Sequence, residues 1–145
     1  GQFEARLKRI SPHLLRAPVE AVDENLKRFY DRLLSVLRDE AVRNGSWRQL
    51  ECVPAWIGNG SNDNFVACEW LGTDGQRLLV AVNDSPNQSQ CYVRFPHDDL
   101  KQRKWRLNDR MSEANYDRDG TDLFSRGLYL DLPAGNYHVF HLDHA

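Results

Sequence analysis

The sequence predicts a mainly β fold, in which one long α-helix precedes an antiparallel β-sandwich of about seven to eight strands in a Greek-key-like order. Two observations indicate this fold. Apolar residues recur at helical spacing between residues 23 and 45, and short apolar stripes of period two follow, separated by turn residues. We therefore divide the chain into residues 1–45, an irregular segment with a helix, and residues 46–145, the β-sandwich domain.

The helix is predicted to run from Asp23 to Gly45. Pro12 and Pro18 punctuate residues 1–22, because each biases the residue before it away from helix. Asp23 is a good N-cap, and Gly45 is placed to end the helix as a left-handed C-terminal cap. The apolar stripe is wider than one sheet needs, so we expect the helix to pack on more than one surface. Its members are Leu26, Phe29, Tyr30, Leu33, Leu34, Leu37 and Ala41.

The strands are predicted from alternating apolar residues and from the turns between them. Residues 78–82, "LLVAV", are continuously apolar, which is typical of a central strand covered on both faces. Asp74-Gly75 predicts a hairpin turn just before this strand. Period-two alternation predicts the other strands in 65–71, 90–95, 104–108, 128–132 and 136–142.

The composition excludes several classes of function. The 145 residues carry 19 Lys and Arg against 21 Asp and Glu, so no basic excess exists to neutralise nucleic-acid phosphates. No apolar run approaches the length of a membrane span. The three widely spaced cysteines predict free thiols in a reducing compartment. We therefore expect a cytoplasmic protein without a nucleic-acid or membrane partner, and no pattern indicates a cofactor.

No catalytic constellation is visible in the sequence. There is no GxSxG elbow for a serine nucleophile, and no cysteine has a neighbouring base in sequence. His138 and His141 are three residues apart on a predicted strand, so they face opposite sides and cannot share a metal ion. We therefore assign neither a catalytic nor a metal-binding residue.

The stretch "NYDRDGTD", residues 115–122, begins like a calcium loop. With Asn115 at the first position, Asp117, Asp119 and the glycine fall where such a loop needs them. The twelfth position, however, is Arg126, a cation where a bidentate Glu is required. The stretch is therefore interpreted as a polar connection between two strands, with its turn at Asp119-Gly120.

The aromatic residues offer the one candidate ligand surface. Trp70 and Trp105 fall in what the alternation indicates as the inward register of their strands, which predicts core positions. Trp56 lies in a Gly/Asn-rich stretch, and among the tryptophans it has the weakest indication of a core position. A carbohydrate-binding surface would pair Trp56 with Tyr116 or Tyr92, because flat aromatic faces pack well on sugar rings.

Four stretches carry a family resemblance. Residues 26–50 show an "FY..LL.LR.......G.W..L" pattern, and residues 78–96 show an apolar run followed by an alternating strand. Residues 127–142 close with a Pro-containing turn and a strand with an aromatic near its end. Residues 1–20 begin Gly-Gln-Phe-Glu, close to a Gly-(Gln/Asp)-Glu-like motif. Together they resemble the last barrel helix and the C-terminal all-β domain of α-amylase-family glycoside hydrolases (glycoside hydrolase family 13).

The resemblance implies a non-catalytic role in α-glucan metabolism. In that family two carboxylates at the ends of barrel strands catalyse a retaining reaction, and no residue here matches them. The resemblance implies that the segment 1–45 ends in the last helix of a (β/α)8 barrel missing from this chain, and that the barrel is the partner of the β-sandwich. The isolated chain should then self-associate. Two alternatives are a carbohydrate-binding module that anchors a parent enzyme to glucan, and a protein-interaction β-domain with a docking helix.

Overall fold

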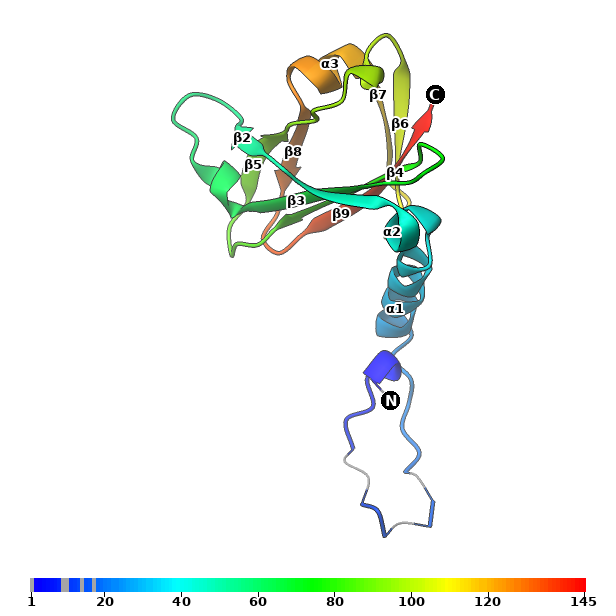
Figure 1. The fold of residues 1–145 in the computed structure, drawn as a ribbon. Helices are drawn as coiled ribbons and strands as arrows, with labels where there is room; N and C mark the ends of the chain where they lie inside the picture. The colour runs from blue at the N-terminus through cyan, green and yellow to red at the C-terminus, as the bar shows by residue number, and fades with distance from the viewer. Residues whose placement is uncertain (1, 9–10, 14, 17) are drawn as a thin grey trace. The chain divides into compact units, whose positions relative to one another are not determined.

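A computed structural model describes residues 2–8, 11–13, 15–16 and 18–145 of the chain (Figure 1). The chain divides into two compact units, Gly1–Arg38 and Asp39–Ala145. The second unit is the mainly β part, and it holds the core and the candidate sites. The prediction that the first segment belongs to a barrel stays a prediction.

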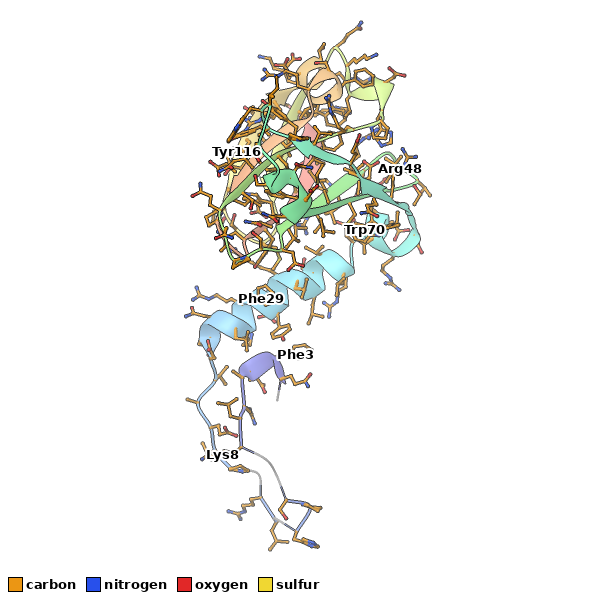
Figure 2. The ribbon with its side chains drawn as sticks, turned by 90° about the vertical axis from the view of Figure 1, so that its left-hand side faces the viewer. Phe3, Lys8, Phe29, Arg48, Trp70 and Tyr116 are labelled. Atoms are coloured by element: carbon orange, nitrogen blue, oxygen red, sulfur yellow. The ribbon has the colours of Figure 1, made fainter. Side chains whose placement is uncertain are left out.

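The first unit consists of a short 3-10 helix, η1 (Gln2–Glu4), and the long helix α1 (Glu24–Leu37). Helix α1 begins where the sequence predicts, because the Asp23 side chain accepts hydrogen bonds from the backbone N–H groups of Asn25 and Leu26 at 3.0 Å. Phe3 on η1 lies edge-to-face against Tyr30, with 4.9 Å between ring centroids (Figure 2). Most of the predicted apolar stripe of α1 is only half-buried, and Leu37 is 51% exposed.

The helix is shorter than the prediction of residues 23–45. Helix α1 ends at Leu37, and Asp39 takes an extended conformation and caps a separate short helix, α2 (Glu40–Asn44). Gly45 is not the predicted left-handed cap, because its φ of −80° lies in the extended region. Glycine is needed there for space: a Cβ would lie 2.2 Å from the carbonyl oxygen of Ala41 and 2.5 Å from that of Leu71.

The second unit is an antiparallel β-sandwich, which confirms the predicted fold class. Among the described residues, nine strands form one sheet of six in the order β1-β3-β4-β9-β6-β7 and one of three in the order β2-β5-β8 (Figure 1). The six strands of the first sheet are β1 (Ser46–Leu50), β3 (Phe65–Leu71), β4 (Arg77–Asn83), β9 (Tyr137–His144), β6 (Lys104–Asp109) and β7 (Asn115–Asp119). The three strands of the second are β2 (Cys52–Pro54), β5 (Ser89–Val93) and β8 (Leu128–Leu132).

The core lies between the two sheets and contains most of the predicted apolar stripes. Strand β4 is central, as predicted, and β8 contributes the buried leucines of its predicted stripe. Short helices close one end of the core: η3 (Asp98–Leu100) and α3 (Gly120–Ser125) each bury a leucine. The largest fully buried side chains of this core include Phe140, Leu79, Leu100, Leu107, Leu123 and Val93.

The sandwich is closed by the chain along one side only. Strand β1 ends at Leu50 and β2 begins at Cys52, so Glu51 alone carries the chain from one sheet to the other. The opposite edges of the two sheets are β7 and β8. These edge strands are not hydrogen-bonded to each other, and a groove lies between them.

The stretch 115–122 is a strand followed by a helix, which corrects the predicted polar connection. Residues 115–119 form β7, and Asp119 caps α3 by accepting hydrogen bonds from the backbone N–H groups of Thr121 and Asp122. Gly120 is the first residue of the helix rather than part of a turn. A Cβ at this position would lie 1.8 Å from the carbonyl oxygen of Leu100, so only glycine allows this approach.

The register of β3 differs from the prediction. Phe65, Ala67 and Glu69 face the core, whereas Val66, Cys68 and Trp70 lie on the outer face of the six-stranded sheet. The prediction of a core position is therefore wrong for Trp70 and confirmed for Trp105, which is 4% exposed. Alternation alone does not decide between two faces of a strand when both carry apolar side chains.

Candidate functional site

A groove lies where the edges of the two sheets part, between β7 and β8. Its volume is about 170 Å³. Tyr116 and Arg118 reach it from β7, because both point to the inner face of the six-stranded sheet at its edge. Figure 2 labels Tyr116 in this unit. The remaining lining residues are His138 and Phe140 of β9 and Leu128, Tyr129, Leu130, Asp131 and Leu132 of β8.

One wall of the groove is built on a buried Asp–His pair. His138 Nδ1 lies 2.9 Å from Asp109 Oδ2, and the carboxylate side chain of Asp109 is 3% exposed. Asp109 also accepts hydrogen bonds from the Ser112 hydroxyl and from the backbone N–H groups of Met111 and Val139. Burial acts to raise the pKa of Asp109, but these hydrogen bonds outweigh it and lower the pKa to about 2. The carboxylate is therefore ionised and fixes the orientation of the imidazole.

Three aromatic rings meet beside this pair. The imidazole of His138 stacks on Phe140 with 4.6 Å between centroids, and Tyr116 stands nearly perpendicular to Phe140 at 5.8 Å. The guanidinium carbon of Arg118 lies 5.3 Å from the centroid of the Tyr116 ring. Tyr116 remains 38% exposed. The β7 wall therefore presents an ordered aromatic and cationic surface to solvent.

The β8 wall supplies a second tyrosine and an acid. Tyr129 is 42% exposed and packs on Tyr92 of β5 at 5.4 Å between centroids. Asp131 Oδ1 accepts hydrogen bonds from the side-chain amides of Gln88 and Gln90, at 2.8 and 3.0 Å. Neither β8 residue can be singled out from the sequence, since between the leucines of the stripe both have the pattern of ordinary solvent-facing positions.

The structure places the two sequence-predicted sugar-binding residues differently. Tyr116 lines the groove, and Tyr92, the alternative predicted partner of Trp56, packs on the groove residue Tyr129. Trp56 lies in the loop between β2 and the 3-10 helix η2 (Ser61–Asn64), where it is 56% exposed, and it is not among the residues that line the groove. The predicted pairing of Trp56 with Tyr116 is therefore not part of this groove.

The Asp109–His138 pair is not a hydrolytic triad. Ser112 Oγ donates to Asp109 rather than to the imidazole, and among the hydrogen bonds of the described residues no hydroxyl or thiol is bonded to an imidazole ring. Within the same residues, no three His, Cys, Asp or Glu side chains are grouped to hold a metal ion. His138 and His141 lie on opposite faces of β9, as predicted. Among the described residues, the groove therefore holds no hydroxyl or thiol that is hydrogen-bonded to an imidazole.

A second buried acid–base pair lies at the end of the core and has a structural role. Glu69 on β3 and His97 are joined at 2.5 Å, with side chains 4% and 14% exposed. Nearby in sequence, Asp99 accepts two hydrogen bonds from the guanidinium of Arg77, which is also buried. Both links hold the segment around η3 onto the sheet, and neither lines the groove.

The outer face of the six-stranded sheet carries an apolar patch, which we call the apolar face. Trp47 on β1 and Val66 on β3 are 58% and 51% exposed, and the other members are half-buried. Helix α2 lies against β1, β3 and β4 and buries Ala41 completely. The apolar face consists of Trp47, Val66, Cys68, Trp70, Val80 and Val82.

Comparison of the chain with models of known protein families and with curated proteins gives no match. Among the described residues, none of the helices is long and apolar enough to cross a membrane.

Proposed function

We propose that this chain is the non-catalytic C-terminal region of an α-amylase-family enzyme acting on α-glucans, and that its β-sandwich supports the catalytic barrel. The observation that carries this proposal is the apolar face. The sequence resemblance supplies the identity of the partner, since residues 26–50 and 78–96 resemble the last barrel helix and the following domain of that family.

The distribution of side chains on one sheet favours a covered surface. At the β6–β7 end, the outward residues are charged: Lys104, Arg106, Asp117 and Asp119. At the β1–β3–β4 end, the outward residues other than Gln49 and the buried Leu78 form the apolar face. An antiparallel sheet with a solvated outer face normally carries polar residues along all of it. We infer that solvent meets the charged end and that another protein surface covers the apolar end.

Covering the apolar face gives a hydrophobic gain that favours docking. Complete burial of one valine or larger apolar side chain contributes about 1.5–3 kcal/mol relative to full exposure. Trp47 and Val66 retain about half of their surface, and the half-buried members of the apolar face add smaller amounts. Covering the apolar face therefore offsets part of the entropic cost of association, particularly when the partner belongs to the same chain.

The acids in and beside the groove do not support a catalytic role for this chain. The groove is lined by one acid, Asp131, and the oxygens of Asp109, which lies behind His138, are all engaged in hydrogen bonds. The retaining mechanism needs two carboxylates about 5–5.5 Å apart on either side of a glycosidic bond. We therefore place the acids of the reaction in the barrel. No release of reducing sugar from maltoheptaose is expected from this chain alone, and measurable hydrolysis contradicts the proposal.

The main test measures association with the barrel. The native reading frame upstream of Gly1 is expected to encode a (β/α)8 barrel with three acids, which can be expressed separately and titrated with this chain in sedimentation-velocity experiments. The double variant Val66→Glu/Val82→Glu places two charges on the apolar face and should abolish binding. Val53→Glu is the matched control, because Val53 is half-buried on β2 of the other sheet. Equal binding by both variants contradicts a docking role for the apolar face.

The alternative, a protein-interaction domain with a docking helix, predicts that association depends on a different set of residues. The α1 stripe is half-buried along most of its length, so it too offers apolar surface. If association depends on Leu33 and Leu34 of α1 and is unchanged by Val66→Glu/Val82→Glu, the helix carries the interaction. If the upstream frame encodes no barrel, the family assignment fails.

A further inference from the structure

The groove between β7 and β8 holds polar groups that have capacity left for a ligand. Because Asp109 is ionised and faces Nδ1 of His138, that nitrogen carries the proton, and in the neutral ring Nε2 is an acceptor. Among the described residues, no hydrogen bond is made by Nε2. Asp131 accepts the hydrogen bonds from the side-chain amides of Gln88 and Gln90 on Oδ1. Within the described residues, its Oδ2 accepts no hydrogen bond. The groove therefore presents two positioned atoms, His138 Nε2 and Asp131 Oδ2, that can hydrogen-bond a ligand.

Donors stand beside these acceptors. The guanidinium of Arg118 uses one nitrogen for the backbone carbonyl of Asp117 at 2.9 Å, which leaves its other N–H groups for solvent or a ligand. The hydroxyls of Tyr116 and Tyr129 can donate or accept. Acceptors and donors gathered in one groove match neighbouring hydroxyl groups, each of which donates one hydrogen bond and accepts others.

The rings supply the apolar part of the surface. Tyr116 and Tyr129 come from the two facing edge strands and keep 38% and 42% of their surface exposed. Their backing is rigid, because Tyr116 packs on Phe140 and Tyr129 packs on Tyr92. Rigid, exposed aromatic faces bind the C–H surface of a ligand at a low cost in conformational entropy.

The charges on the groove balance. Arg118 and Asp131 have opposite signs, and the charge of Asp109 is compensated by its four hydrogen bonds. A net field that would attract a phosphate-rich or strongly acidic ligand is absent from this set of lining residues. The chain as a whole carries a net charge of −2. A neutral ligand with many hydroxyls fits these charges better than an anion does.

We propose that this groove binds a neutral oligosaccharide, with Tyr116 and Tyr129 against sugar rings and with His138, Arg118 and Asp131 hydrogen-bonded to hydroxyl groups. This inference goes beyond the proposed supporting role, and it replaces the predicted pair of Trp56 and Tyr116. The volume of about 170 Å³ is below the roughly 300–1,000 Å³ of clefts that enclose drug-sized ligands. The groove therefore holds one or two rings of a longer chain, and the dissociation constant should be about 0.1–1 mM.

The experiment is isothermal titration calorimetry of the full chain with maltoheptaose and, separately, with cellohexaose. Tyr129→Ala and Asp131→Asn should each weaken binding at least tenfold, because both residues are exposed on β8 and carry little of the fold. Tyr116→Phe keeps the packing on Phe140 and removes only the hydroxyl, so a smaller loss is expected. Trp56→Ala removes another exposed aromatic residue outside the groove and should bind like the wild type.

The outcomes separate this inference from the proposed function. Binding of maltoheptaose that requires Tyr129 supports the groove and its link to α-glucans. Binding of cellohexaose alone, with the same requirement, supports the groove but removes the support for an α-glucan ligand. No binding of either sugar, or binding lost in Trp56→Ala and retained in Tyr129→Ala, overturns the inference. None of these results depends on whether Val66→Glu/Val82→Glu still binds a barrel.

Discussion

The replacement Asp109→Asn tests the role of the buried carboxylate in the stability of the β-sandwich. Asp109 links the end of β6 to the turn that follows it and to β9, through Met111, Ser112, His138 and Val139. An asparagine can still accept from the backbone N–H groups through its one carbonyl oxygen. Its amide nitrogen, however, faces two donors, the Ser112 hydroxyl and the imidazole, and leaves them unsatisfied.

The magnitude follows from the pKa of the carboxyl group. The folded structure lowers the pKa of Asp109 from 3.8 to about 2. At about 1.4 kcal/mol for each factor of ten in proton affinity, this corresponds to roughly 2 kcal/mol of stabilisation. The unfolded chain binds the proton more readily than the folded one. The contribution is therefore complete above the unfolded pKa of 3.8 and is lost as the pH falls through about 2.

The assay is urea unfolding at several pH values, followed by the near-ultraviolet circular dichroism of the β-sandwich, where Trp105 is buried. At pH 7 we expect Asp109→Asn to lower the free energy of unfolding by about 2–3 kcal/mol. The gap between wild type and variant should narrow between pH 4 and pH 2. Asp117→Asn is the matched control, because Asp117 is exposed and paired with Arg106 at the surface, and little change is expected.

Two results would refute this reasoning. The first is a variant as stable as the wild type at pH 7, which means that the carboxylate contributes nothing beyond what an amide provides. The second is a difference in stability that stays constant from pH 7 to pH 2, which means that the lost stability does not come from the ionised form of Asp109.

Two further predictions concern the packing of the sandwich. Gly120→Ala should destabilise the chain by about 1–3 kcal/mol, since the new Cβ would lie 1.8 Å from the Leu100 carbonyl oxygen. The control is Gly60→Ala, which should change the urea midpoint little because no atom lies within 4 Å of its new Cβ. Equal effects of the two replacements would contradict the steric explanation. Leu107→Ala should lower the free energy of unfolding by about 2–5 kcal/mol, because Leu107 is 0% exposed between the sheets. A decrease below about 1 kcal/mol in the same urea assay would contradict this prediction and would mean that the core collapses around the cavity.

The candidate site was only partly accessible from the sequence. Tyr116 could be singled out as an aromatic residue in a polar stretch, and it does line the groove. Its partners could not be found in this way, because Asp109, Tyr129 and His138 lie on three different strands, and their proximity to Tyr116 depends on how the sheets pair and pack. Trp56 was singled out for its Gly/Asn-rich surroundings, a local property that says nothing about which other residues lie beside it.

The sequence by itself determined the local elements whose pattern is unambiguous. Asp23 starts the helix because its side chain caps free N–H groups. Asp74-Gly75 turns the chain between β3 and β4, with Gly75 at a φ of +86°. The leucine stripe at 128–132 forms a core strand because only one of its faces is apolar.

Only the tertiary structure decided which surfaces meet. Strand β3 is apolar on both faces, so its register depended on pairing with β1 and β4, and this pairing placed Trp70 outside the core. Gly45 and Gly120 have the pattern of a helix end and a turn in the sequence, yet both are required where distant carbonyl groups approach. The groove exists because β7 and β8 are the edges of different sheets. These properties arise from contacts between residues far apart in the chain, and periodicity along the chain carries no information about them.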